Sequence, residues 1–467
     1  MATPPPADSV SRRLADALAS ARFEMLATED VSATQRSILD WLGSALSGSL
    51  EAPARIAQRV SASLGASDEA TVFSSGRGSA AAAALANGVA SHILEFDDIH
   101  KTSTVHAAAP IIPAALAVAE REHASGRDFL LAVAVGYEAA LRVGEAVNPS
   151  HYRYWHPTGT AATFSAAAAA SSLLHLDAKQ MIDALGSAGT QAAGLWEFNA
   201  DGAMSKHLHP GKAAMNGVLS ADLAFAGFTG ASRILEGDRG FFRAMSASHD
   251  ATRVIDGLGE RWKIRENCYK LHSCCGHTHT AIDVALDLRA EGGWAGSDAL
   301  GEIAAIEIDT YGPGFEIVKE SVPRTAYQAK FSLAYCVAVA LQEGSSGLDQ
   351  FAPERFSASG VIDPGIRSLI ERTRVAVAAD LTAKYPAAWP TRVRVRLTDG
   401  TAVSAESDFP RGNPENPVST EALEAKFTGL VAPRFGSAVA ERALAVVRSI
   451  EACADMASAF RNLVPAS

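Results

Sequence analysis

The sequence predicts a mainly α-helical protein, with a large helical domain formed by both ends of the chain and a smaller α+β domain inserted between them. Apolar residues recur at helical spacing over residues 10–263 and again over 408–467. Alternating, strand-like segments occur only between residues 264 and 407. An α+β unit inserted into a helical domain accounts for this order.

The first helical region contains amphipathic segments followed by segments of very small residues. Residues 33–49 place Ile38, Trp41 and Leu42 on one helical face. Further helices are expected at 79–96, 113–126, 127–147, 159–176 and 211–228. The last two are dominated by Ala, Ser and Gly, which lets helices pack closely or be buried on all sides. These segments therefore predict a tightly packed helical core.

The middle region carries two strand signals. Residues 302–311 alternate apolar and acidic side chains. In residues 391–407, Val393, Val395 and Leu397 alternate with arginines, and Asp399-Gly400 is a typical hairpin turn. This part of the chain is therefore expected to contain a β-hairpin and at least one further strand.

Composition restricts the function. The chain has 467 residues, 48% of them hydrophobic and 20% charged, which is ordinary for a globular protein. The net charge of −11 disfavours nucleic-acid binding, which needs a basic surface. No apolar run suits a membrane span or a signal peptide, so a cytoplasmic protein is expected. The five cysteines suggest no disulfide framework, and Cys274 and Cys275 are expected to be small buried residues.

The candidate functional residues occur where histidine or lysine precedes an alanine-rich helix start. The four positions contain His106; His156; Lys206, His207 and His209; and Lys270, His272, His277 and His279. A helix N-terminus offers unpaired N–H groups and a partial positive charge, so these residue types predict an anion site. If the positions converge, the expected ligand is a small carboxylate with more than one acid group. Histidines there can transfer protons, oriented by Asp97 or Asp98.

A simpler interpretation competes for each residue. One histidine near a helix start is more often a cap or a surface residue than a catalyst. We prefer this interpretation for His207, His209 and His272 taken singly, and a solvated side chain for Lys212. Thr158 is expected to cap the helix that follows His156. The repeated arrangement favours a functional role for His106, His156 and Lys206.

The acidic segment also shares features with two kinds of metal site. Residues 97–101, "DDIHK", begin like the DDxxD magnesium motif of helical prenyl-chain enzymes, but the third acid is missing. His92, Asp97, Asp98 and His106 are ligand types found in His-Asp phosphohydrolases, but no adjacent His-Asp pair occurs. The sequence also has no P-loop and no GxSxG elbow. Both metal interpretations are therefore less favoured than an anion site.

The same segments carry a resemblance that extends nearly end to end. They are "ANGVASHILEFDDIH", "VHAAAPIIPAALAVAE", "HPTGTAATFSAAAAASSLLHLD", "GSAGTQAAGLWEF", "MSKHLHPGKAAMNG", "AKFSLAYCVAVAL" and "GNPENPVSTEALEAKF". The chain resembles the MmgE/PrpD family, which includes 2-methylcitrate dehydratases, cis-aconitate decarboxylases and an iminodisuccinate epimerase. These motifs are typical of the family as a whole and do not select one of its reactions.

The resemblance implies a helical domain, over residues 10–263 and 408–467 here, and an α+β lid domain, over residues 264–407. It also implies a homodimer that uses neither a metal nor an organic cofactor. The catalytic positions of the family fall on Asp97, Asp98, His106, His156 and Lys206, and its lid histidine falls on His277 or His279. The residues expected to bind substrate are these two histidines, Glu95 of the acidic loop, and Lys270, which lies in the fourth of the positions described above. On this basis His106 is the expected acid/base, and Lys206 and His156 bind substrate carboxylates.

Two departures from the family pattern concern the substrate. Glu95 stands where the family often has the first Asp of "DFDD", and Ala107-Ala108 follows His106 where Pro-Ser or Pro-Gly is common. The expected activity is that of a metal-free lyase on a small di- or tricarboxylic acid, with 2-methylcitrate-type dehydration first. The alternatives are an epimerase, isomerase or decarboxylase on a related acid, and a catalytically silent carboxylate-binding protein.

Overall fold

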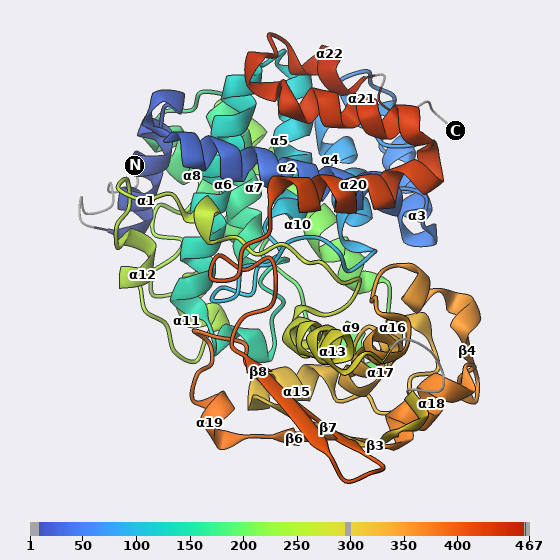
Figure 1. Cartoon of the computed structure of the whole chain (residues 1–467). Helices are drawn as coiled ribbons and strands as arrows, with labels where there is room; N and C mark the ends of the chain where they lie inside the picture. The colour runs from blue at the N-terminus through green and yellow to red at the C-terminus, as the bar shows by residue number, and fades with distance from the viewer. Residues whose placement is uncertain (1–8, 295–299, 462, 464–467) are drawn as a thin grey trace. The chain divides into compact units, whose positions relative to one another are not determined.

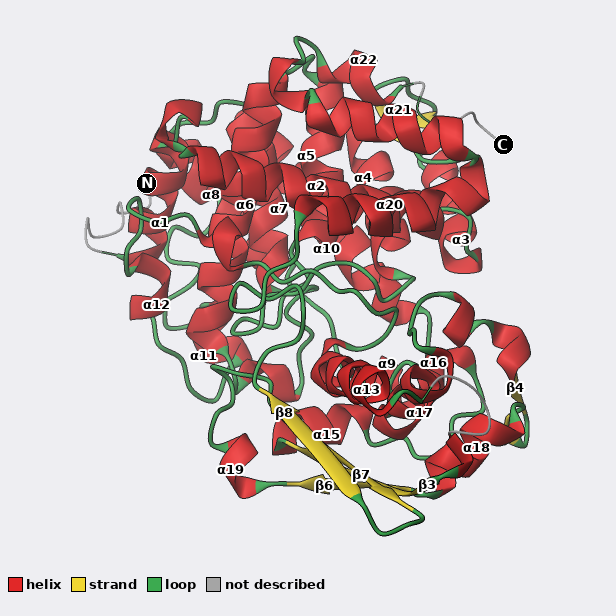
Figure 2. Cartoon of the chain, viewed as in Figure 1, coloured by secondary structure: helices red, strands yellow, loops and turns green. Residues whose placement is uncertain are grey.

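The computed structural model describes residues 9–294, 300–461 and 463, and it is mainly α-helical, as predicted (Figure 1). The chain forms two compact units. The first contains Met1–Ile93, Asp97–Asn267 and Ser419–Ser467, and the second contains Leu94–Phe96 and Cys268–Val418. Figure 2 shows that the first unit is built almost wholly of helices and loops, whereas the second contains a β-sheet.

The first unit is a helical assembly with one short β-hairpin. Its longer helices are α1 (Val10–Ser20), α2 (Thr28–Gly48), α3 (Ala52–Ser63), α4 (Ala80–His92), α5 (Ala108–Arg121), α6 (Gly126–Val147), α7 (Ala161–Leu173), α8 (Ala178–Gly189), α10 (Ser205–Phe225), α20 (Thr420–Phe435) and α21 (Ser437–Arg448). The short elements are β1 (Ala70–Val72), β2 (Gly76–Gly78), α9 (Phe198–Asp201), α11 (Phe241–Met245), α12 (Thr252–Ile255) and α22 (Met456–Phe460).

The two ends of the chain meet in this unit, where α2 and α20 lie side by side (Figure 1). The hydroxyl of Ser47 on α2 donates to the carbonyl of Leu430 on α20 at 2.8 Å. The buried ammonium of Lys426 lies 2.6 Å from a carboxylate oxygen of Asp40. The C-terminal helices therefore belong to the same helical unit as the N-terminal ones, which confirms the predicted fold class.

The alanine-rich helices lie at the centre of the unit. In α7 every residue except Ser172 is buried, and α4 and α5 are also buried on nearly all sides. A helix without an amphipathic face can be buried this way when its side chains are small. Their close packing brings several loop–helix junctions together in one place, which positions the site described below.

Helices α4 and α10 cross in close contact at Gly88 of α4 and Gly211 of α10. A Cβ added at Gly211 would lie 2.6 Å from the carbonyl oxygen of Leu85 and 2.6 Å from a methyl group of Val89. We therefore expect Gly211→Ala to force the helices apart and lower the free energy of unfolding by about 1–3 kcal/mol. The matched control is Gly429→Ala on the exposed side of α20, where nothing lies within 4 Å.

Urea denaturation measures both glycine variants. The control is expected to be neutral or stabilised by about 0.5–1 kcal/mol, because alanine restricts the unfolded chain. Equal stability of the Gly211→Ala and Gly429→Ala proteins would show that α4 and α10 can separate without cost.

The second unit is built around a four-stranded sheet of order β6-β3-β7-β8. Its elements are β3 (Ile303–Thr310), β4 (Phe356–Ser357), β5 (Gly360–Val361), β6 (Thr373–Val377), β7 (Thr391–Leu397), β8 (Ala402–Ser407), α13 (His279–Gly292), α15 (Gly312–Val318), α16 (Ala326–Ala329), α17 (Leu333–Glu343), α18 (Pro364–Glu371) and α19 (Ala379–Thr382).

The two predicted strand regions are confirmed. β7 and β8 form the expected antiparallel hairpin, and β3 pairs antiparallel with β7, placing Ile306 opposite Val395 and Ile308 opposite Val393. These side chains are buried, and α13 and α17 pack against each other and against the sheet (Figure 2). Strand β6 pairs parallel to β3 at the edge of the sheet and is not predicted by the sequence pattern.

Candidate active site

Three buried histidines gather in the first unit. His92 ends α4, His106 precedes α5, and His156 precedes α7. The ring centroids lie 4.6 Å apart for His92 and His106, 5.6 Å for His92 and His156, and 6.0 Å for His106 and His156. All three side chains are buried. We call these three residues the histidine cluster.

Asp97 lies beside two members of the histidine cluster. One of its carboxylate oxygens, Oδ2, lies 2.7 Å from Nδ1 of His92 and 3.3 Å from Nδ1 of His106. Because an ionised carboxylate only accepts hydrogen bonds, the hydrogen bond to the nearer ring favours a proton on Nδ1 of His92. The basic lone pair of a neutral His92 ring is then at Nε2. For His92, Nε2 is buried and has no hydrogen-bond partner among the described residues.

His156 forms a second pair with His209 of α10. Their Nδ1 atoms are 3.0 Å apart, so one donates and the other accepts. Burial, and then the charges of neighbouring histidines and Lys206, lowers the pKa of His156 well below its ordinary value. Burial is also the main cause that lowers the pKa of His209 to about 3. Both rings are therefore neutral at neutral pH.

Lys206 supplies a buried cation beside this pair. It is the second residue of α10, and only 2% of it is exposed. Its charge contributes to lowering the pKa of both His156 and His209. The ammonium group therefore acts in the same electrostatic environment as these two imidazoles, which suits binding of a carboxylate.

The side chain of Asp98 lies against the first residue of α5. Its two carboxylate oxygens lie 3.1 and 3.3 Å from the backbone N–H of Ala108, and the hydroxyl of Tyr137 donates to Oδ2 at 2.5 Å. Burial raises the pKa of Asp98 to about 7, with smaller contributions from the charges of Asp97 and Asp40 and an opposing one from the Tyr137 hydrogen bond. Asp98 thus connects the acidic loop to the helix that follows His106.

The raised pKa of Asp98 predicts a pH-dependent stability. The folded protein keeps a proton on Asp98 that the unfolded chain loses above pH about 4. This contribution to stability is therefore complete below pH 4, and it is lost as pH rises towards about 7. The loss amounts to about 4 kcal/mol at most. We expect Asp98→Asn to remove this component, because asparagine does not titrate.

Urea midpoints of both proteins between pH 4 and 8 provide the measurement. The difference between Asp98→Asn and the unmodified protein should shift in favour of the variant as pH rises, because the other titrating groups are shared. Asparagine can still accept from Ala108 and donate to the oxygen of Tyr137. A constant difference across this pH range would contradict the assigned pKa.

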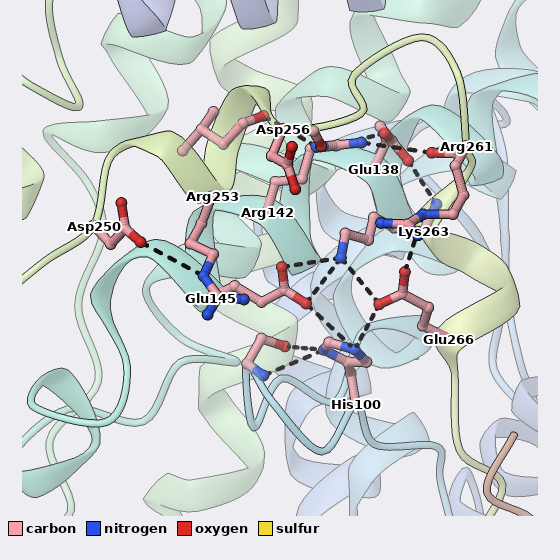
Figure 3. A network of polar contacts seen from close by, with 12 residues as sticks. His100, Glu138, Arg142, Glu145, Asp250, Arg253, Asp256, Arg261, Lys263 and Glu266 are labelled. Carbon is pink, nitrogen blue, oxygen red and sulfur yellow. Dashed lines mark hydrogen bonds and ion pairs between the residues drawn. The ribbon is translucent and has the colours of Figure 1, made fainter. Parts of the chain in front are cut away.

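A buried polar network holds the loop between Asp98 and His106 (Figure 3). Nδ1 of His100 accepts from the backbone N–H of Ser103 at 3.2 Å, so the ring proton is at Nε2. This Nε2 lies 3.7 Å from carboxylate oxygens of both Glu145 and Glu266. The ammonium of Lys263 lies 3.0 Å from the same two side chains. We call His100, Glu145, Lys263 and Glu266 the His100 network; it fastens the loop to α6.

Two of the predicted substrate-binding residues meet in the second unit. Nζ of Lys270 donates to the backbone carbonyl of Glu95 at 2.9 Å and lies 3.6 Å from its carboxylate. Glu95 has a left-handed backbone with φ of 56°. Lys330 and Ser273 both donate to the carbonyl of the preceding residue, Leu94, at 2.7 Å. The short segment Leu94–Phe96 is thus held by side chains of the second unit.

The two predicted lid histidines are also buried in the second unit. Nδ1 of His277 lies 2.6 Å from the hydroxyl of Tyr311, and its ring lies 4.5 Å from that of Trp389. Nε2 of His279 lies 3.3 Å from the carbonyl of Cys274, and burial lowers the pKa of His279. Each ring therefore has a protein partner within its own unit.

Sequence comparison identifies the family of this chain. The N-terminal domain of the MmgE/PrpD family matches residues 12–254, and the C-terminal domain of the same family matches residues 272–452. The chain belongs to the MmgE/PrpD family. The resemblance seen in the sequence motifs is thereby confirmed.

Several curated proteins are similar to this MmgE/PrpD family member over most of its length. A cis-aconitate decarboxylase-like protein of Aspergillus oryzae is 30% identical over 395 residues, 80% of each chain. The cis-aconitate decarboxylase of Aspergillus terreus is 28% identical, covering 75% of this chain and 74% of its own. The human cis-aconitate decarboxylase is 26% identical and covers 95% of this chain and 92% of its own.

The structure corrects three details of the predicted site in this family member. Lys206, like His207 and His209, lies inside α10, because the helix already begins at Ser205. Thr158 does not cap α7; Thr160 occupies the N-cap position, and the hydroxyl oxygen of Thr158 accepts from the backbone N–H of His106 at 3.1 Å.

The third correction concerns Lys212, which is not a solvated side chain. Its ammonium donates to the carbonyls of Gly159, Gln191 and Ala193 at 3.2, 3.1 and 2.9 Å. Burial lowers its pKa to about 8. Lys212 therefore connects α10 to the segment before α7 and to the segment after α8.

His92 and His209 have a larger place in the site than the sequence predicts. The sequence indicates His92 only as a metal ligand, although its position five residues before Asp97 is a local signal. It predicts a cap or surface position for His209, whose partner His156 is 53 positions away. No spacing rule connects residues so distant, so tertiary packing was needed to find this pair. Cys274 and Cys275 are buried, as predicted.

No helix in the described ranges is long and apolar enough to cross a membrane. This finding concerns residues 9–294, 300–461 and 463. It agrees with the absence of a long apolar run from the sequence.

Proposed function

We propose that this protein is a lyase that acts on a small di- or tricarboxylic acid by proton transfer next to a carboxylate. The observation that carries the proposal is the position of Asp97 Oδ2 between Nδ1 of His92 and Nδ1 of His106. Such a carboxylate fixes the ring orientation and stabilises the imidazolium that forms when Nε2 takes a proton. Family membership and the similarity to cis-aconitate decarboxylases support the same reaction class.

In this proposal His106 is the main acid/base. Its backbone N–H donates to Thr158, and its Nδ1 lies 3.3 Å from the carboxylate of Asp97, which would stabilise a positive charge on the ring. A positioned imidazole contributes about 10²–10⁴-fold to a proton-transfer step. His92 shares the same carboxylate oxygen, and its Nε2 provides a second base within the histidine cluster.

Lys206 and His156 bind and polarise the substrate carboxylates. Carbanion-like charge next to a carboxylate spreads onto its oxygens, and cations or N–H donors in a site that excludes water stabilise it strongly. Lys206 offers a buried positive charge and His156 a neutral ring. A neutral imidazole can donate without repelling the ammonium, so the two groups can act on one anion.

Decarboxylation is placed first among the reactions of this class. The bond between the substrate carbon and the departing carboxylate breaks, CO₂ leaves, and the electron pair stays on carbon. The imidazolium of His106 then delivers its Nε2 proton to that carbon and is reprotonated from solvent. Similarity to cis-aconitate decarboxylases favours this order over the dehydration expected from sequence motifs. Dehydration stays the second candidate.

The test is a substrate panel followed by proton NMR in D₂O. The panel contains cis-aconitate, 2-methylcitrate, citrate, tartrate and iminodisuccinate isomers. We expect loss of CO₂ from cis-aconitate, with one deuterium in the product. Water loss from 2-methylcitrate would replace decarboxylation by dehydration, and exchange without loss of either would indicate an epimerase. Dicarboxylate binding without any conversion would overturn the proposal in favour of a silent binding protein.

EDTA separates this proposal from a metal-dependent hydrolase. We expect dialysis against EDTA not to lower the rate, because proton transfer and charge stabilisation come from side chains. The substrate-binding roles predicted for Glu95, Lys270, His277 and His279 stay predictions, as does the homodimer.

A further inference from the structure

The histidine cluster has the ligand set of a transition-metal site. One nitrogen from each of His92, His106 and His156 lies within 4.8 Å of the other two. Three imidazoles with a fourth position left open are a ligand set that proteins use for Zn²⁺. Imidazole is a ligand type that also suits Cu²⁺ and Ni²⁺. All three rings are buried, so an ion there would be surrounded by protein.

His92 supplies the second, independent observation. Its side chain is fully buried, and its Nε2 has no hydrogen-bond partner within the described ranges. An unsatisfied buried nitrogen of this kind costs free energy that a bound ion would recover. Nδ1 of the same ring faces Asp97 at 2.7 Å. A carboxylate behind a histidine is the usual outer support of a zinc ligand, because it leaves the Nε2 lone pair free for the metal.

We propose that His92, His106 and His156 bind one divalent transition-metal ion, Zn²⁺ foremost, and that the bound ion inhibits the enzyme. The fourth coordination position would be filled by water or by a carboxylate of a small acid. The binding does not depend on the proposed function, whereas the inhibition does. The ion would engage the ring of His106, which is the acid/base of the proposed reaction, and so block proton transfer.

The His100 network provides an internal contrast. His100, Glu145 and Glu266 also place ligand atoms within 4.8 Å of one another. Figure 3 shows the ammonium of Lys263 directed at both carboxylates, 3.0 Å from each. The ammonium of Lys263 thus contacts both carboxylates directly and offsets one of their two charges, and a metal ion that binds both carboxylates would have to displace it. We therefore expect zinc at the histidine cluster and none at the His100 network.

Zinc binding to the whole protein tests the proposal without an activity assay. The protein is first treated with EDTA, then titrated with ZnCl₂ by calorimetry, and its zinc content is measured after desalting. We expect one zinc ion per chain. Asp97→Asn should weaken binding by about 10–100-fold, since this residue supports the ligands. His92→Asn should abolish stoichiometric binding, and His100→Asn should retain it.

Two further measurements keep the result interpretable. Circular dichroism shows whether each variant is folded, and Co²⁺ in place of Zn²⁺ reports nitrogen coordination by its visible absorption. Fewer than one zinc ion per chain in the titrated, unmodified protein would overturn the proposal. Full zinc binding by a folded His92→Asn variant would also overturn it. The same holds if folded His100→Asn loses zinc while His92→Asn keeps it.

The inhibition is tested on whichever panel acid the enzyme converts. Saturating Zn²⁺ should stop turnover, and EDTA should restore it. If zinc binds but turnover continues, the inhibitory role is wrong while the metal site stands. If no panel acid is converted, the proposed function fails, and the calorimetric result still decides the metal site by itself.

Discussion

Replacing His106 by alanine is expected to lower kcat by about 10²–10⁴-fold on the converted substrate, with a much smaller change in KM. The reason is that His106 is the ring whose Nδ1 faces Asp97 and whose backbone is held by Thr158. Loss of the imidazole removes the proton donor and acceptor, whereas Lys206 and His156 can still bind the carboxylates. Steady-state kinetics of the purified variant measures both constants.

The control for this variant is His123→Ala. The side chain of His123 is 71% exposed and pairs with the surface residue Asp455, so its removal should leave the rate unchanged. Near-normal turnover by folded His106→Ala would move the acid/base role to another ring, with His92 the first to test. Near-normal rates in both His106→Ala and Lys206→Ala would contradict the proposed mechanism altogether.

Replacing Arg142 by methionine is expected to lower the free energy of unfolding by about 3–5 kcal/mol. Arg142 is fully buried, and its guanidinium lies 2.5 Å from the carboxylate of Glu138 (Figure 3). It also donates to the carbonyls of Val254 and Asp256 at 3.3 and 2.6 Å. The variant would leave Glu138 as a buried charge without its main partner. Urea denaturation measures the loss.

Two further variants sharpen this result. Arg253→Met removes a comparable cation from an exposed pair with Asp250, so it should change stability by less than about 1 kcal/mol. Adding Glu138→Gln to Arg142→Met should recover part of the loss, because the uncompensated charge disappears. A loss below about 1 kcal/mol for Arg142→Met would mean that water or Lys263 replaces the guanidinium.

Local sequence patterns predicted most of the elements. The amphipathic run at 127–147 became α6, whose first turn is capped by Ser125 and Asp128. The alternation at 391–407 became the hairpin β7–β8. Such patterns succeed because one buried face imposes a period on the residues that form it. The five-residue strand β6 was missed, since it is short and mostly half-exposed and so shows no clear alternation.

Boundaries and partners were harder to predict. The expected helix at 79–96 ends at His92, because the chain turns away before Glu95, whose φ is positive. The helix expected after Pro210 starts earlier, at Ser205, and therefore includes Lys206. Proline is tolerated in the first turns of a helix, where its missing N–H costs little, so its position only approximates the start.

The family, the helical class, the hairpin and the chemical types at the candidate site can be predicted from the sequence alone. Which of these groups meet depends on tertiary packing. Packing places one oxygen of Asp97 between two imidazoles, pairs His156 with His209, and directs Asp98 at the backbone N–H of Ala108. The physical reason is that these contacts depend on the close crossing of buried small-residue helices, and a local pattern specifies that a helix is buried but not which helix it packs against.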